Sequence, residues 1–339
     1  MDDVQKEHWE DVIKVFNDVA VNAISLFPVI APNAEVKLIN YSENATYLTT
    51  NPVTEEKYIL RVSRPNYHKK YEIDSELEWL ESIYEAAPIQ VAMPIKGGNN
   101  EFIQSVMLEN DPQEYYCTLF TFLDGKTLDE NKESELVKQF ENLGEMTARL
   151  HEHSIKNHHM FKKKNRLTWD YDTILGERPK WARWQDGLAI TPERRELLEE
   201  VSQTIKRRLE KFGKGRDRFG LIHADLRLAN LLVDKDQISV IDFDDCGFGW
   251  YLFDLGTSLS FIEDQPYVPD LINSWLKGYR KVRPLTQEEE EEIPTFIMMR
   301  RLQLISWVGS RDNETAEALG GKYSEDTDRL AIEYLQKMK

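Results

Sequence analysis

The chain has 339 residues, of which 41% are hydrophobic and 30% are charged, the composition of a folded globular protein large enough for two domains. Its formal net charge of −17 disfavours binding to nucleic acid, which requires basic surfaces. Its two cysteines are too few for a disulfide framework, and no apolar run reaches the ~20 residues of a membrane span. We therefore expect a cytoplasmic protein with no membrane or nucleic-acid partner, whose oligomeric state the composition leaves open.

The first third of the sequence alternates short apolar runs with polar turns. Apolar side chains at helical spacing predict one helix over residues 2–26 and another over residues 71–85. Five strands are expected, at residues 36–40, 45–50, 57–62, 102–108 and 115–123. This order describes a small sheet with a helix inserted after its third strand.

The rest of the chain is predicted to be mostly helical. The expected helices are residues 134–153, 193–212, 267–282, 286–309 and 324–338. A stretch rich in aromatic residues lies between the first two of these helices. Its aromatic residues are Phe161, Trp169, Tyr171, Trp181 and Trp184. These side chains either line a binding pocket or pack the interior of the helical region.

A predicted hairpin in the second half carries the clearest chemical signal. Its apolar strands, residues 231–233 and 238–241, are joined by a polar turn. Asp225 and Asn230 precede the first strand and Asp242 follows the second, so two carboxylates and one carboxamide reach the same end of the hairpin. This set suits phosphoryl transfer, in which one Asp receives the proton of an acceptor hydroxyl and the other two residues bind Mg2+.

The ligand chemistry supports that interpretation. Magnesium prefers carboxylate, carbonyl and water oxygens, of which Asn230 and Asp242 supply two. The sulfur and imidazole pattern of a zinc site is absent from this segment. The alternative is that Asp225 and Asn230 only form turns and Asp242 only caps a helix.

The stretch from His223 to Asn230 resembles the catalytic loop of protein kinases and, more closely, that of the aminoglycoside phosphotransferase family. Residues 241–245 resemble the metal-binding segment of that family, and residues 250–256 resemble the helix start that follows it. The family includes choline kinases, type II homoserine kinases, fructosamine kinases and a bacterial stress-response protein kinase. One departure is Ala224, where the family most often has Gly.

This resemblance implies the fold and the activity. We expect an α+β, two-lobed protein-kinase-like fold, with an antiparallel-sheet N-lobe over residues 1–123 and a mainly helical C-lobe over residues 124–339. The implied enzyme is an ATP- and Mg2+-dependent phosphotransferase that moves the γ-phosphate to a hydroxyl of a small molecule. An aminoglycoside, homoserine, a choline-like amine and a sugar all stay open as acceptors, and GTP stays open as the nucleotide.

The resemblance also assigns residues to the nucleotide. Arg61 occupies the place of the Lys that holds the α- and β-phosphates in kinases, and Glu76 the place of the Glu that orients it. Arg can bind phosphate bidentately, although its geometry differs from that of Lys. The alternative is an ordinary surface ion pair.

Three further assignments follow from the same resemblance. Ser42 and Asn44 lie in the turn that covers the phosphates in kinases, and they either contact phosphate or only form the turn. Backbone groups of Phe120 and Phe122 would bind adenine at the end of a strand. Arg227, two residues after the catalytic Asp, resembles a Lys that steadies the γ-phosphate, with a scaffold contact as its alternative.

Two other functions compete with the small-molecule kinase. The first is a Ser/Thr protein kinase of the bacterial stress-response type. Asp254 lies only twelve positions after Asp242, which leaves too little chain for the long activation segment of eukaryotic-type protein kinases. The second is a nucleotide-binding scaffold without catalysis, against which the complete set of Asp225, Asn230 and Asp242 argues.

Overall fold

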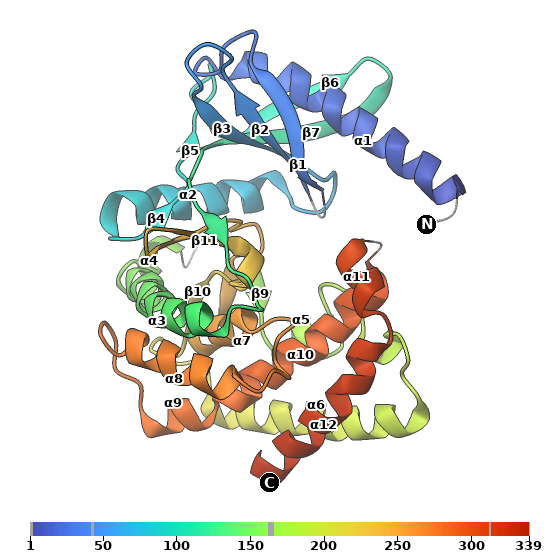
Figure 1. Cartoon of the computed structure of the whole chain (residues 1–339), viewed down its shortest axis with the longest axis vertical. Helices are drawn as coiled ribbons and strands as arrows, with labels where there is room; N and C mark the ends of the chain where they lie inside the picture. The colour runs from blue at the N-terminus through green and yellow to red at the C-terminus, as the bar shows by residue number, and fades with distance from the viewer. Residues whose placement is uncertain (1–2, 42–43, 162–165, 312, 339) are drawn as a thin grey trace. The chain divides into compact units, whose positions relative to one another are not determined.

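The structure, a computed structural model, describes residues 3–41, 44–161, 166–311 and 313–338. The chain divides into two compact units (Figure 1). The first unit comprises Met1–Glu85 and Val91–Leu123, and the second comprises Ala86–Gln90 and Asp124–Lys339. The first unit is built on an antiparallel sheet and the second is mainly helical.

The sheet of the first unit has six strands among the described residues, in the order β1-β2-β3-β7-β5, with β6 also paired to β7. The strands are β1 (Glu35–Tyr41), β2 (Asn44–Thr50), β3 (Lys57–Ser63), β5 (Pro94–Ile95), β6 (Gln104–Leu108) and β7 (Asp111–Thr121). The prediction of five strands is therefore one short, because it omits β5. Two residues are too few to show an alternating pattern, and β5 is defined only by its pairing with Leu119 and Phe120 of β7.

Two helices complete the first unit. Helix α1 (Asp3–Ala23) continues into a short 3-10 turn, η1 (Ile24–Leu26), and packs on β3, β6 and β7. Its buried side chains Phe16 and Val19 join a core that includes Leu60 and Val62 of β3. Helix α2 (Lys70–Ala86) follows β3, as predicted.

The predicted hairpin forms in the second unit as β11 (Leu231–Asp234) and β12 (Gln237–Val240). It is extended into a sheet of order β4-β12-β11-β8 by β4 (Gln90–Val91) and β8 (Lys126–Thr127). This hairpin holds Asp225, Asn230 and Asp242 near its open end.

A second small sheet has the order β10-β13-β9. Its strands are β10 (Phe219–Ile222), β13 (Gly247–Trp250) and β9 (Leu167–Trp169). Strand β13 is not among the predicted elements. Its glycines allow close approach of the strands, since a Cβ at Gly247 would lie 2.6 Å from the carbonyl oxygen of Leu167 in β9.

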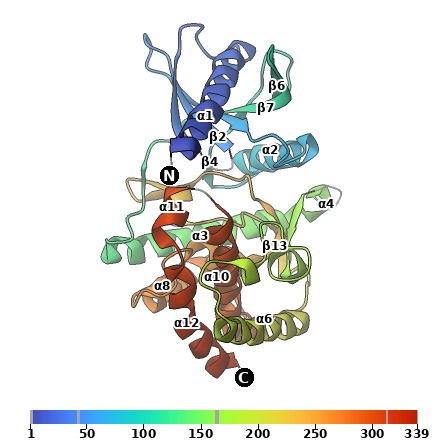
Figure 2. The same cartoon turned by 90° about the vertical axis from the view of Figure 1, so that its right-hand side faces the viewer.

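The remaining elements of the second unit are helical. In chain order they are α3 (Glu133–Lys156), α4 (His158–Phe161), α5 (Tyr171–Ile174), η2 (Trp184–Asp186), α6 (Pro192–Phe212), η3 (Leu228–Asn230), α7 (Tyr251–Ser258), α8 (Val268–Tyr279), α9 (Gln287–Glu291), α10 (Ile293–Ser310), α11 (Glu314–Leu319) and α12 (Lys322–Met338). Helix α3 packs along α8, and α10 packs against α6, α7 and α12 (Figure 1 and Figure 2). In the described part of the chain no helix is both long and apolar enough to cross a membrane.

The expected helix over residues 286–309 is in fact two helices, α9 and α10. The chain breaks at Glu292, and Pro294 lies in the first turn of α10, where its missing N–H costs no hydrogen bond. The short helix α11 was not predicted.

Candidate active site

The loop after β10 is fixed by the first turns of α7. The buried carboxylate of Asp254 accepts hydrogen bonds from the backbone amides of Ala224 (2.7 Å) and His223 (3.2 Å). The hydroxyl of Thr257 accepts another from the amide of Leu226 (3.0 Å). These bonds satisfy buried backbone donors and hold the loop that carries Asp225. Asp254 therefore supports the loop through the backbone of the loop.

Two residues near this loop have left-handed backbone conformations. Ala224 has a φ of 68° and Asp242 a φ of 64°. A side chain in this region costs roughly 1–2 kcal/mol, which Gly avoids. Ala224, where the resemblance leads us to expect Gly, therefore carries this backbone cost. Such strain gathers at functional sites, where the surrounding contacts enforce it.

The carboxylate of Asp225 is surrounded by nitrogen donors. Its Oδ2 accepts hydrogen bonds from Asn230 Nδ2 (2.8 Å) and Arg227 Nε (3.2 Å). Its Oδ1 accepts one from Arg300 in α10 (2.5 Å). The structure thus brings together the predicted residues Asp225, Arg227 and Asn230 and adds Arg300, which was not predicted.

The charges around Asp225 keep it ionised. Burial raises the pKa of its carboxyl, but the positive charges of Arg300 and Arg227, together with His223, outweigh burial. The net result is a pKa below the ordinary value. An ionised carboxylate can accept the hydrogen bond of a hydroxyl at neutral pH, and it thereby orients that hydroxyl.

The sequence of α10 contains a signal for Arg300. Arg300 and Arg301 stand side by side in a helix whose other residues are mostly apolar, and both side chains are buried. Buried guanidinium groups require partners, so this pair alone indicates a polar cluster inside the unit. Its partners could not be identified from the sequence.

Asn230 and Asp242 meet the chemical requirements of a magnesium site. The backbone oxygen of Asn230 accepts a hydrogen bond from the amide of Ile241 (3.1 Å), which ties Asn230 to the residue before Asp242. The amide nitrogen of Asn230 is bonded to Asp225, so its amide oxygen is the atom suited to a cation. Asp242 is exposed. One carboxylate and one amide oxygen suit Mg2+, which keeps further places for water and phosphate.

The part of the chain that the structure describes contains no group of three or more His, Cys, Asp or Glu residues that could hold a metal ion. In kinases, nucleotide phosphates supply further ligands to the metal ion.

The segment after Asp242 is held by residues from the aromatic stretch and the residues before it. The guanidinium of Arg166 donates to the carbonyl oxygens of Phe243, Asp244 and Cys246. Trp169 Nε1 donates to the carbonyl oxygen of Asp245 (2.6 Å). Trp169 thus packs against this segment and orients it. Of the two roles expected for the aromatic residues, this contact is packing of the interior and not lining of a binding pocket.

Trp181 and Trp184 differ in their surroundings. Trp184 is buried, whereas Trp181 is partly exposed and its ring centroid lies 5.4 Å from the guanidinium carbon of Arg300. Trp181 therefore contacts Arg300, which in turn binds Asp225.

In the first unit, Arg61 of β3 and Glu76 of α2 form a bidentate ion pair. Both N–H···O distances are 2.8 Å, and the side chains are only 6% and 1% exposed. The guanidinium also lies 5.2 Å from the ring centroid of Phe120. The pair is therefore buried, which excludes the alternative of a surface ion pair.

The other residues assigned to the nucleotide are placed as follows. Asn44 opens β2, and its side-chain oxygen accepts a hydrogen bond from the amide of Arg64 (3.1 Å), so it ties β2 to the end of β3. Ser42 lies outside the described residues. Phe120 is buried in β7, and Phe122 follows the strand with the Lys57 ammonium 5.3 Å from its ring centroid.

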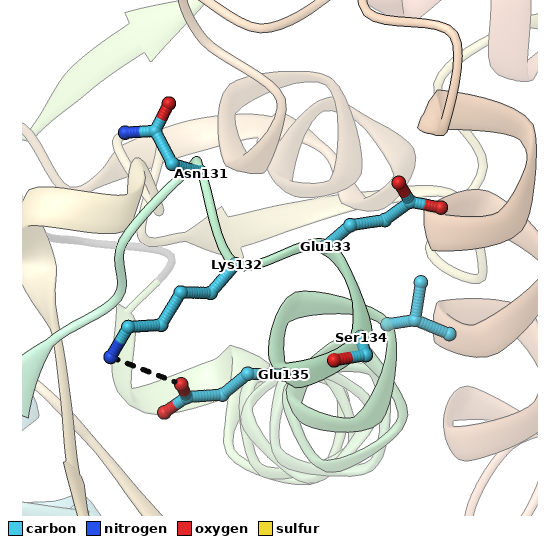
Figure 3. A pocket seen from close by; sticks show the side chains of 6 residues that line it. Asn131, Lys132, Glu133, Ser134 and Glu135 are labelled. Carbon is cyan, nitrogen blue, oxygen red and sulfur yellow. Dashed lines mark ion pairs between the residues drawn. The ribbon is translucent and has the colours of Figure 1, made fainter.

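The second unit also has a surface hollow at the start of α3 (Figure 3). Asn131, Glu133 and Ser134 line it, together with an exposed ion pair between Lys132 and Glu135 (3.5 Å). This hollow does not include Asp225 or its neighbours. It is separate from the candidate catalytic residues.

Comparisons with known proteins identify the family of this chain and its fold. The sequence model of the family described as "Phosphotransferase enzyme family" matches residues 35–285. The structure of the microcompartment-associated aminopropanol kinase is similar at a TM-score of 0.85 and 36% identity, over 95% of this chain and 99% of that chain. Amicoumacin kinase of Bacillus subtilis (strain 168) is 24% identical over 304 residues, 86% of this chain and 85% of that protein.

A structure of amicoumacin kinase hAmiN in complex with AMP-PNP, Ca2+ and Ami has a TM-score of 0.74 at 18% identity, over 94% of this chain and 96% of that chain. Together these similarities confirm the predicted α+β, protein-kinase-like fold class.

Proposed function

This chain belongs to the phosphotransferase enzyme family and is a small-molecule kinase, and we propose that it transfers the γ-phosphate of ATP to the hydroxyl group of a small amino alcohol, with Mg2+ as the metal ion. The observation that carries the proposal is the carboxylate of Asp225, held ionised among Asn230, Arg227 and Arg300. The similarity to an aminopropanol kinase over nearly the whole of both chains favours an amino alcohol as the acceptor.

In this proposal each residue of the second unit has a separate task. Asp225 accepts the hydrogen bond of the acceptor hydroxyl and receives its proton. Arg227 lies beside that carboxylate and offsets the charge of the incoming γ-phosphate. Asn230 and Asp242 bind Mg2+, which when bound neutralises charge on the phosphates.

The residues of the first unit serve the nucleotide. Arg61, oriented by Glu76, binds the α- and β-phosphates, and Asn44 supports the neighbouring turn. Backbone groups of Phe120 and Phe122 bind adenine. The AMP-PNP and Ca2+ bound to amicoumacin kinase hAmiN support the use of ATP and a divalent cation by this chain.

The experiment is an acceptor screen with the purified protein. ADP release from Mg-ATP is measured with 1-amino-2-propanol, ethanolamine, choline, homoserine, an aminoglycoside and a sugar, and Asp225→Asn is the matched control. We expect the highest kcat/KM with an amino alcohol and little activity in the control. A protein that prefers the sugar or the aminoglycoside contradicts the proposed acceptor class, and equal activity in Asp225→Asn contradicts the catalytic assignment.

We also propose a cytoplasmic location. Cys117 and Cys246 are both free and buried, which suits a reducing compartment. Recovery of the protein from a secreted fraction of its native cells, rather than from the cytoplasm, would contradict this.

A further inference from the structure

Arg300 is a buried cation with a fixed guanidinium group. Its Nε donates to the hydroxyl of Ser260 (2.9 Å), and its first terminal nitrogen donates to Gln303 Oε1 (3.0 Å). Its second terminal nitrogen donates to Asp225 Oδ1 (2.5 Å). The side chain is 2% exposed. Because all three nitrogens are bonded, the planar group has one orientation, and that orientation directs one N–H at Asp225.

These bonds belong to a closed circuit around the catalytic loop. The hydroxyl of Ser260, which accepts from Arg300, donates to the carbonyl oxygen of Thr257 (2.6 Å). The hydroxyl of Thr257 accepts from the amide of Leu226, the neighbour of Asp225. Arg300 therefore holds the carboxylate of Asp225, while the same network holds the backbone beside it. A circuit of this kind locks one side-chain conformation of Asp225 relative to the loop.

The number of hydrogen-bond donors around the Asp225 carboxylate shows where one more donor can bind. An ionised carboxylate has about four lone-pair sites, two on each oxygen. Among the described residues, Asn230 and Arg227 occupy two sites on Oδ2, and Arg300 occupies one on Oδ1. The fourth site lies on Oδ1, the oxygen that Arg300 holds.

We propose that Arg300 is the residue that positions the acceptor hydroxyl, by fixing Asp225 so that the second lone-pair site of Oδ1 is the only one available to that hydroxyl. This inference rests on the proposed function. The hydroxyl oxygen then forms the new bond to the γ-phosphorus, and the bond from that phosphorus to the β,γ-bridging oxygen breaks. ADP leaves with that electron pair, and the hydroxyl proton passes to Asp225.

The role has a measurable consequence, because water needs less alignment than a bound acceptor. If Arg300 is lost, Asp225 can rotate, and an acceptor hydroxyl is no longer held in line with the γ-phosphate. Transfer to the acceptor falls, while hydrolysis of ATP by water falls less. The ratio of phosphorylated acceptor to inorganic phosphate therefore reports positioning, whereas a general loss of folded protein lowers both products in proportion.

Arg301 is a matched control. It is the next residue in α10, is also 2% exposed and also forms a buried ion pair, with Glu263 (2.9 Å). Its other hydrogen bonds reach Thr327 and Tyr323, and none reaches Asp225. Arg301→Gln thus removes an equally buried cation from the same helix without touching the catalytic carboxylate.

The experiment compares the wild type with Arg300→Gln, Arg300→Lys, Ser260→Ala and Arg301→Gln. Each variant is incubated with Mg-ATP and 1-amino-2-propanol, and phosphorylated acceptor, inorganic phosphate and Mg-ATP affinity are measured. We expect Arg300→Gln to lower kcat for transfer about ten- to a hundredfold, the effect of one charge-assisted hydrogen bond, with unchanged Mg-ATP affinity and a lower product ratio. Arg300→Lys should recover part of the ratio and Ser260→Ala should lower it less than Arg300→Gln.

The controls separate the possible failures. An unchanged product ratio in Arg300→Gln, or an equal decrease of the ratio in Arg301→Gln, overturns the positioning role. If Arg300→Gln does not fold, an unchanged product ratio in Ser260→Ala overturns it. A wild type that transfers phosphate to none of the amino alcohols in the acceptor screen overturns the proposed function itself, whereas an active wild type with an unchanged Arg300→Gln overturns only the role of Arg300.

Discussion

The buried pair of Arg61 and Glu76 gives a prediction whose size follows from its geometry. Replacing Arg61 with Met keeps an apolar side chain of similar length over Phe120 but removes both 2.8 Å hydrogen bonds to Glu76. The Glu76 carboxylate, 1% exposed, then loses its guanidinium partner away from water. Removing one member of a buried ion pair typically costs about 3–5 kcal/mol. Because about 1.4 kcal/mol changes an equilibrium constant tenfold, this cost raises the equilibrium constant for local opening by roughly two to three and a half powers of ten.

Amide hydrogen exchange of β3 and α2, followed by mass spectrometry, measures that equilibrium within the first unit. The matched controls are Glu76→Leu and the double variant Arg61→Met with Glu76→Leu. Because a buried pair replaced by apolar residues is often neutral, the double variant should be less destabilised than either single variant. A loss of protection below about tenfold in Arg61→Met, or additive losses in the double variant, refutes the reasoning.

Three further outcomes are expected. Asp242→Ala should abolish Mg2+-dependent nucleotide binding in calorimetry, and an unchanged affinity and rate would exclude Asp242 as a metal ligand. Asp225→Asn should keep Mg-ATP affinity and lower the rate about 10²–10⁴-fold, the usual contribution of a general base, so an equal loss of affinity would be contradictory. Burial lowers the pKa of the His151 imidazole below its ordinary value of 6.5. As the pH drops below 6.5, the unfolded chain therefore binds a proton at His151 before the folded chain does, and the free energy of unfolding should fall. In His151→Asn the thermal midpoint should depend less on pH in that range, and an unchanged dependence would argue against a buried neutral His151.

Much of the fold could be predicted because its patterns are local. The strands over residues 36–40, 45–50 and 57–62 and the helix over residues 71–85 are within one or two residues of their observed bounds. The catalytic loop, the hairpin and Asp254 lie within one short stretch, so their spacing alone placed them together. The structure also brings Arg61 and Glu76 together as predicted, whereas their part in nucleotide binding stays a prediction.

What could not be predicted depends on contacts between distant parts of the chain. Arg300 follows Asp225 by 75 residues, and nothing in the sequence of α10 indicates which carboxylate it reaches. Strand β5 has no pattern of its own, and the glycines of β13 are explained by the close approach of β9, which lies about 80 residues earlier. In each case the residue type is explained by a partner that the sequence does not identify.

The central claim is that this chain phosphorylates a hydroxyl group of a small amino alcohol. Phosphorus-31 NMR of the wild type with Mg-ATP and 1-amino-2-propanol tests it most directly, because a phosphate ester, a phosphoramidate and inorganic phosphate give separate resonances. We predict an ester resonance that grows in step with ADP in the wild type and that grows about a hundredfold or more slowly in Asp225→Asn. A spectrum in which ATP yields only inorganic phosphate, or a phosphoramidate on the amine, would contradict the claim.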